Sequence, residues 1–386
     1  MKEQQFLRIP GPTPIPPSVE RAMIQPMIGH RSGDFKQLYG RLIPRLQPVF
    51  GTRQDVLVLA ASGTAGLEAA AVNAVKEGEK VLVIVTGAFG ERFTDICETY
   101  RFNVDRLDVT WGEAVKPDAV KAYLKKNPDT RAVFVTYCET STAVLNPIEE
   151  IAQAVRETSD ALVIADGVSC IGGTETEMDA WGIDILITGS QKAMMLPPGL
   201  VFIAASDRAW ARIEANSQPR FYLDLLKYRK SAQDHSSPFT PAVSLLYGLE
   251  EALNIMEEEG LENVYKRHRL MKTMIRAAAD ALQLPLLTSE EAGSPTVTAI
   301  RPTAFDAEAL RSEVKKTFSL TLAGGQKQLK GQIFRIGHMG YCSPADILQT
   351  ITMLEIGLDR IGADIRLGTG TAAAQRVFLL EKGDNR

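Results

Sequence analysis

Over residues 56–204 the chain alternates short, almost entirely apolar runs with stretches of helical character. The apolar runs lack the polar alternation of a strand with one wet face, so helices are expected on both faces of their sheet. This rhythm predicts an α/β layer with a largely parallel sheet and right-handed crossovers. The predicted strands cover residues 56–60, 81–85, 132–136, 161–165, 184–188 and 200–204.

The second half of the chain changes character. Leucines at helical spacing over residues 243–282, interrupted by Gly260, predict two consecutive helices. An α+β pattern follows, with strands predicted at 296–300 and 332–336 and a helix at 306–317.

With 386 residues, the chain is too long for one ordinary core, so we expect two domains in close contact. Five prolines between residues 10 and 17 favour an extended path over a helix. We predict an N-terminal arm at 1–17, a large domain at 18–282, a small domain at 283–367 and a tail at 368–386. The tail shows no clear role and is expected to be partly disordered.

Composition excludes several classes of protein. The net charge is −4, so no basic excess supports binding to nucleic acid. No apolar run is long enough to span a membrane, and the first residues lack the apolar core of a signal peptide. The four cysteines show neither metal-ligand spacing nor a disulfide framework, which makes the cytoplasm the simplest compartment.

Ser62, Gly63 and Thr64 stand between the first predicted strand and an alanine-rich helix. The free amides and the dipole of a helix N-terminus suit a phosphate group, and the two hydroxyls add donors. An ordinary helix cap is the alternative, because capping is the common use of serine and threonine there.

Asp166 and Lys192 each follow a predicted buried strand, at the sheet edge where ligands of parallel sheets bind. A carboxylate there needs a cationic partner such as a protonated pyridine nitrogen, although a helix cap or loop brace would also explain it. A desolvated lysine is suited to be a Schiff-base nucleophile, whereas most lysines are surface residues.

Phe89 and Arg335 are two further candidates. Phe89 follows the second strand, where Gly87 and Gly90 lack the G-x-G-x-x-G spacing of a dinucleotide site. Phe89 therefore either stacks on a ligand ring or belongs to the core. Arg335 stands inside an apolar strand and needs an anion, either a substrate carboxylate held bidentately or an internal acid.

The order and spacing of four short motifs resemble the class V aminotransferases of pyridoxal 5'-phosphate (PLP) fold type I. The motifs are S-G-T at 62–64, A-D-G-V at 165–168, G-S-Q-K at 189–192 with P-P-G after it, and R-I-G at 335–337. The match runs from residue 10 to about 340. It is most similar to the alanine–glyoxylate and serine–pyruvate aminotransferase group.

This resemblance implies PLP as cofactor, no metal, a homodimer with shared active sites, and a large PLP-binding domain beside a smaller C-terminal α+β domain. It also implies a role for each motif residue. Lys192 would be the Schiff-base lysine that also moves the α-proton, and Asp166 would be the partner of the pyridine nitrogen. The cofactor ring would lie between Phe89 and Val168, with Thr140 as the partner of a ring substituent. The phosphate would be contacted by Ser62, Gly63, Thr64 and Gln191 and, from the second chain, by Thr240, while the substrate would be contacted by Arg335 and Gly11.

The sequence departs from the family pattern at two places. Phe89 stands where the family often has tryptophan, and Ser237 stands where it often has a tyrosine that reaches the second site. His30 and Arg31 are expected either to line the pocket and select a polar donor or to lie at the dimer interface or surface.

The resemblance implies ping-pong transfer of an amino group from a small amino acid, alanine or serine, to glyoxylate or pyruvate. Ureidoglycine–glyoxylate and aspartate aminotransferases are the alternatives. A cysteine desulfurase needs a reactive cysteine on a mobile loop before the arginine, whereas Cys342 follows Arg335. An interaction subunit without catalysis and a nicotinamide dehydrogenase are the remaining alternatives, and the latter lacks its glycine motif.

Overall fold

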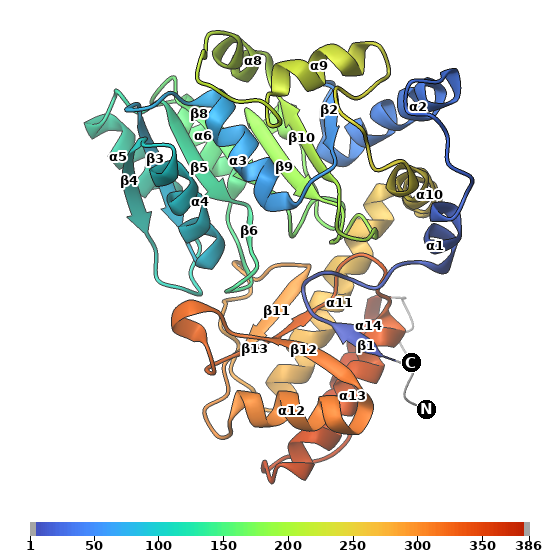
Figure 1. The fold of residues 1–386 in the computed structure, drawn as a ribbon. Helices are drawn as coiled ribbons and strands as arrows, with labels where there is room; N and C mark the ends of the chain where they lie inside the picture. The colour runs from blue at the N-terminus through green and yellow to red at the C-terminus, as the bar shows by residue number, and fades with distance from the viewer. Residues whose placement is uncertain (1–4, 382–386) are drawn as a thin grey trace.

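The computed structural model describes residues 5–381 and shows two units, each built around its own hydrophobic cluster (Figure 1). The larger unit contains a seven-stranded sheet and the smaller one a four-stranded sheet. The predicted α/β class with a mostly parallel sheet is confirmed.

The large sheet has six strands close to the predicted positions and one that was not predicted. Only β10 runs antiparallel to its neighbours, and the other pairs are parallel. The unpredicted strand β4 lies at an edge, and its alternating exposure explains why it shows no apolar run. In sheet order the strands are β2 (Val56–Leu59), β10 (Val201–Ala205), β9 (Ile185–Gly189), β8 (Leu162–Asp166), β5 (Ala132–Thr136), β3 (Lys80–Val85) and β4 (Asn103–Asp108).

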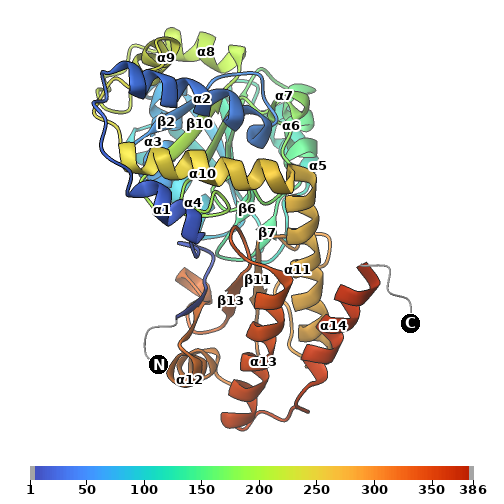
Figure 2. The same cartoon turned by 90° about the vertical axis from the view of Figure 1, so that its right-hand side faces the viewer.

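Helices cover both faces of this sheet, as the unbroken apolar strands require. Figures 1 and 2 show α3 and α4 on one face and α5, α6 and α7 on the other. α8 and α9 follow β10 in the chain. Their bounds are α3 (Gly63–Ala74), α4 (Ala88–Thr99), α5 (Pro117–Lys126), α6 (Ile148–Arg156), α7 (Met178–Trp181), α8 (Asp207–Glu214) and α9 (Leu225–Gln233).

Two long helices connect the units. α10 (Val243–Glu259) packs against α1 (Pro17–Met23) and α2 (Gly33–Phe50), and α11 (Leu261–Ala281) continues into the smaller unit (Figure 2). The break at Gly260, which has a φ of +80°, confirms two helices in place of one. Within residues 5–381, neither α11 nor any other helix combines the length and apolar character needed to cross a bilayer.

The small sheet has the order β1-β12-β13-β11. β1 comes from the predicted arm and pairs in parallel with β12, so the arm begins as part of this sheet. A two-stranded hairpin, β6 (Cys138–Glu139) and β7 (Val144–Leu145), faces this unit from the larger one (Figure 1). The remaining bounds are β1 (Phe6–Arg8), β11 (Val297–Ile300), α12 (Ala307–Phe318), β12 (Leu320–Gly324), η1 (Lys327–Leu329), β13 (Phe334–Gly337) and α13 (Pro344–Arg360).

The expectation of a partly disordered tail is wrong for residues 369–381, which form α14 (Thr369–Glu381). α14 packs against α11 and α13, with Ala374 fully buried. The buried carboxylate of Glu355 in α13 accepts hydrogen bonds from the Gly370 amide at 2.7 Å and the Thr371 hydroxyl at 2.6 Å. A residue distant in sequence thus caps α14, and a local sequence pattern could not predict this contact. Residues 382–386 lie outside the described part of the chain.

Replacing Glu355 by Ala should lower the free energy of unfolding by about 1–3 kcal/mol, because a buried amide loses its acceptor. Urea denaturation with an unchanged m-value would measure this loss. Asp359→Ala, an exposed change one turn further along α13, should stay within about 0.5 kcal/mol of the wild type. Equal stability of all three proteins would show that Glu355 does not anchor α14.

Candidate active site

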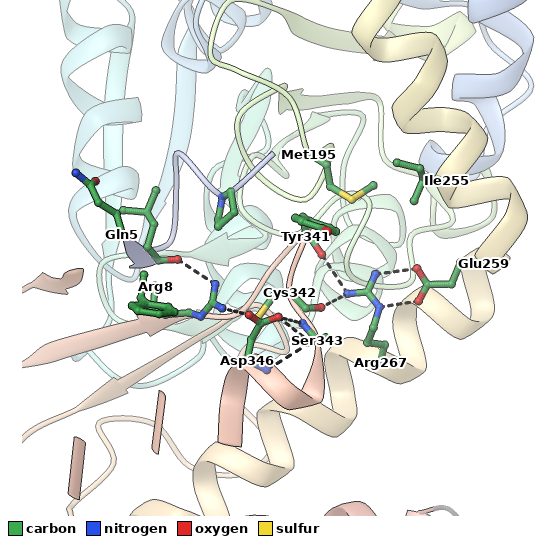
Figure 3. Close-up of a pocket in the computed structure, with 14 residues that line it drawn as sticks. Gln5, Arg8, Met195, Ile255, Glu259, Arg267, Tyr341, Cys342, Ser343 and Asp346 are labelled. Carbon is green, nitrogen blue, oxygen red and sulfur yellow. Dashed lines mark hydrogen bonds and ion pairs between the residues drawn. The ribbon is translucent and has the colours of Figure 1, made fainter. Parts of the chain in front are cut away.

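Two cavities are candidates for the active site. The larger, of about 570 Å³, lies between β1, α10, α11 and the start of α13. Figure 3 shows that its charged groups are already engaged, Arg8 with Asp346 and Arg267 with Glu259. The smaller, of about 130 Å³, collects nearly all of the predicted cofactor residues. Its lining is Ser62, Gly63, Thr64, Leu67, Phe89, Arg92, Thr140, Asp166, Val168, Ser169, Gln191 and Lys192.

Ser62 caps the N-terminus of α3 and accepts a hydrogen bond from the Ala65 amide at 3.4 Å. The ordinary capping role is therefore present, and it leaves the first turn of α3 facing the cavity. A Cβ on Gly63 would lie 3.1 Å from Val168, so a side chain there would crowd the cavity wall. The open amides and the helix dipole make this end of α3 suited to a phosphate.

Asp166 ends β8, and the residue is 4% exposed at the edge of the cavity. Oδ1 accepts a hydrogen bond from the Val168 amide at 2.9 Å, and no other group in residues 5–381 donates to the carboxylate. Burial raises the pKa of Asp166 to about 6, and the Val168 bond opposes that rise. This underpaired acid is suited to hold a ring N–H.

Lys192 lies in the turn after β9, the strand paired with β8, and its side chain lines the same cavity as Asp166. Burial lowers the pKa of the Lys192 amine to about 8. Nζ donates to the Pro10 carbonyl of the arm. Gly11, which has a φ of +116°, adjoins the lysine so closely that a Cβ there would overlap its aliphatic chain. Gly11 thus lies against the Lys192 side chain, and its predicted contact with a substrate stays a prediction.

Phe89 stands in the first turn of α4 and lines the cavity, so it is not a core residue. The guanidinium of Arg92 lies 4.7 Å from the centre of its ring and donates to the Thr64 hydroxyl at 3.2 Å. Sequence reasoning missed Arg92. Its position three residues after Phe89 on one helix was the available signal, because such residues share a face.

Arg335 is buried in β13, lines a separate cavity of the smaller unit, and forms no ion pair with a carboxylate in the described chain. Nη1 donates to the Thr140 carbonyl at 2.8 Å, while Nε and Nη2 donate to the Gly324 carbonyl at 3.0 and 2.7 Å. An internal salt bridge, the alternative expected from sequence, is therefore wrong. Burial lowers the pKa of the Arg335 guanidinium to about 10, so an anionic ligand would stabilise its charge.

Two further polar residues, Ser169 and Gln191, line the cavity, and Glu139 is buried next to Thr140 without lining it. The Thr140 hydroxyl bonds the buried hydroxyl of Ser169, a lining residue that sequence reasoning missed. Glu139, also missed, is fully buried beside Thr140. The amide oxygen of Gln191 is buried without a partner in the described structure. Neighbourhood in the motifs E-T-S-T and D-G-V-S was the only sequence signal for Glu139 and Ser169.

Thr240 is the one predicted cofactor residue outside the cavity. It is exposed, and the nearby Ser237 is buried. Arg31, itself exposed, donates to the Ser237 carbonyl at 2.7 Å and to the Ser236 hydroxyl at 3.2 Å. Within one chain Arg31 therefore anchors the segment that carries Thr240, and neither Arg31 nor the half-buried His30 lines the cavity.

Cys342 does not face Lys192. It lines the larger cavity, is 5% exposed, and burial raises the pKa of its thiol to about 11. A thiol in this state is a poor nucleophile, which argues against desulfuration as the sequence placement did.

The residues present fit PLP by their chemistry. The cavity combines an open helix N-terminus, a buried carboxylate with a single donor and a desolvated amine. These groups match a phosphate, a protonated ring nitrogen and an aldehyde, respectively.

Comparison with known proteins gives an independent view. The sequence profile described as Aminotransferase class-V matches residues 11–365. The small subunit of a soluble hydrogenase from Synechococcus is 43% identical, over 98% of this chain and 99% of that protein. The serine–glyoxylate aminotransferase of Methylorubrum extorquens is 37% identical, over 96% and 95%. The crystal structure of pyridoxamine–pyruvate aminotransferase from Mesorhizobium loti is similar with a TM-score of 0.94 and 30% identity, and covers 99% of each chain. The chain belongs to the class V aminotransferase family, whose members depend on PLP.

Proposed function

We propose that this aminotransferase binds PLP through Lys192 and moves the amino group of a small amino acid, alanine or serine, to glyoxylate or pyruvate. One observation carries the proposal: an amine with a lowered pKa and an underpaired carboxylate share a cavity walled by an open helix N-terminus. The serine–glyoxylate activity in the name of the Methylorubrum relative supports the choice of substrates.

The bound cofactor would act as an electron sink for the bond that is broken at the substrate α-carbon. Ser62, Gly63, Thr64 and Gln191 would hold its phosphate, while Phe89 and Val168 would lie on its two ring faces. Asp166 would accept a hydrogen bond from the ring nitrogen and keep it protonated. Thr140 would bond a ring substituent, and its hydroxyl is already held by Ser169.

Lys192 would act first as a nucleophile and then as the base that moves the substrate α-proton. Both roles need a neutral amine, and burial of Nζ increases the neutral fraction near physiological pH by lowering the pKa to about 8. The Pro10 carbonyl accepts a hydrogen bond from Nζ and so aims the amine at the arm side of the cavity.

Arg335 would bind the substrate carboxylate through the guanidinium N–H groups that its two carbonyl partners leave free. Those carbonyls belong to Thr140 in the larger unit and Gly324 in the smaller one. The substrate would therefore be oriented by an arginine that both units hold in place, with Gly11 close to Lys192 leaving room for it.

The substrates can be tested with the purified protein loaded with PLP. Alanine and serine should convert the cofactor to its amine form, seen as loss of its visible absorbance, and glyoxylate and pyruvate should restore that absorbance. Lys192→Ala is the control and should show neither change at a comparable rate. Response to aspartate or ureidoglycine alone would move the assignment to those donors. A wild-type protein that binds no PLP would instead support a non-catalytic interaction subunit.

The rate at which the PLP-free protein captures PLP should rise about tenfold per pH unit below pH 8 and level off above it, because only the neutral Lys192 amine reacts. The lowered pKa places this midpoint well below that of an ordinary lysine. Stopped-flow absorbance measures the rate. Nα-acetyl-lysine is the control for the titration of PLP itself and should keep gaining rate to about pH 10. A protein that follows the control would contradict a buried amine.

We also propose a homodimer in which Thr240 of each chain reaches the phosphate in the other. Light scattering should give twice 42.2 kDa. Thr240→Ala should weaken PLP binding roughly two- to tenfold through loss of one hydrogen bond to a charged group. Thr273→Ala, an exposed change on α11, should leave the dissociation constant unchanged. A fully active monomer, or equal affinities of the two variants, would refute the shared site.

A further inference from the structure

The N-terminus of α4 is capped by a segment that follows it by about fifty residues in the chain. The Phe89 and Gly90 amides both donate to Oε2 of Glu139 at 3.0 Å. The Ala88 amide donates to the Ser141 hydroxyl at 2.9 Å. Gly87, the local cap position, supplies no side chain. The first turn of α4, and with it Phe89, is therefore fixed by β6 and the connection after it.

The second oxygen of the same carboxylate fixes the connection between β6 and β7. Oε1 of Glu139 accepts from the Ser141 amide at 3.0 Å and from its hydroxyl. Thr140 lies between these two residues, and its carbonyl receives Nη1 of Arg335. One carboxylate thus determines where both Phe89 and the support of Arg335 stand.

Glu139 holds these groups without lining the cavity itself. The side chain is fully buried and has no ion-pair partner in direct contact in the described chain. Amides, a hydroxyl, the dipole of α4 and, at longer range, the Arg335 guanidinium offset its charge. A Cβ on Gly87 would overlap both Glu139 and Ser141. This close approach explains why Gly87 stands in the turn at 86–92, without any need for a nucleotide there.

We propose that Glu139 is a positioning residue of the active site, an internal anion that caps α4 and thereby sets Phe89, Thr140 and Arg335 relative to one another. The inference rests on the proposed function, because the proposed roles of Phe89 and Arg335 are to contact PLP and a substrate carboxylate. It adds that an anion already occupies the N-terminus of α4, so that a phosphate is left with the N-terminus of α3.

Glu139→Gln tests this role at nearly constant volume. Each oxygen of Glu139 accepts from a backbone amide, so either orientation of the glutamine turns its NH₂ toward an N–H donor. We expect the dissociation constant of PLP and the KM of the amino donor each to rise on the order of tenfold, because a displaced site loses orientation. Equilibrium titration of the PLP-free protein gives the first value and steady-state kinetics the second.

Glu355→Ala is the matched control, because Glu355 is likewise a buried carboxylate that caps a helix from a distance, but α14 lies in the smaller unit away from the cavity. Alanine is chosen there because a glutamine could keep Oε1 on the Gly370 and Thr371 amides. This control should lower Tm and leave the PLP dissociation constant and KM unchanged.

The result expected is a rise of both constants in Glu139→Gln and in neither for Glu355→Ala. If Glu139→Gln does not fold, Ser141→Ala should show the same pattern at a few-fold size, since it removes only the Ala88 acceptor and one donor. Loss of Tm with unchanged PLP affinity and KM would reduce Glu139 to a structural cap and overturn the inference alone. A wild-type protein that binds no PLP would overturn the proposed function and the inference together.

Discussion

The site depends on keeping an amine, a carboxylate and a guanidinium in the protein interior without pairing them with one another. No ion pair joins Lys192, Asp166 and Arg335 in the described chain. Burial raises the pKa of Asp166 and lowers those of Lys192 and Arg335, which favours the uncharged form of each group. Burying such charges costs free energy that ligands of opposite charge can recover. The surrounding fold must therefore hold the three groups apart, and the free energy of folding must offset the cost of burying them.

The two sheets divide this work. Asp166 ends β8 and Lys192 follows β9, and the parallel pairing of these two strands brings both residues to one edge of the sheet. Arg335 belongs to the smaller sheet, and its bond to the Thr140 carbonyl crosses to the larger unit. The arm returns to the same place, since β1 lies in the small sheet while Pro10 receives Nζ of Lys192. The smaller unit therefore contacts both Lys192, through the arm, and the Thr140 segment, through Arg335.

Local pattern in the sequence is enough to predict the buried strands and the residues that end them. Such strands are apolar throughout, and their carboxyl ends meet at one sheet edge, so the sequence alone predicts that Asp166 and Lys192 lie together. Features held by distant partners were not predictable: β1 needs β12, α14 needs Glu355, and Glu139 needs the amides of α4. The edge strand β4 was not predicted because its sequence contains no continuous apolar run.

Two helices of the larger unit, α3 and α4, begin beside this cavity, and each has a positive dipole end and first-turn amides without helical partners. Such a fold provides two places for an anion where the chemistry needs one. α3 carries a local serine cap that leaves its first turn open, whereas α4 receives a buried carboxylate from β6. The difference lies in side chains and not in the backbone path. Glu139 therefore already supplies an anion to the N-terminus of α4, whereas the first turn of α3 stays open to a ligand.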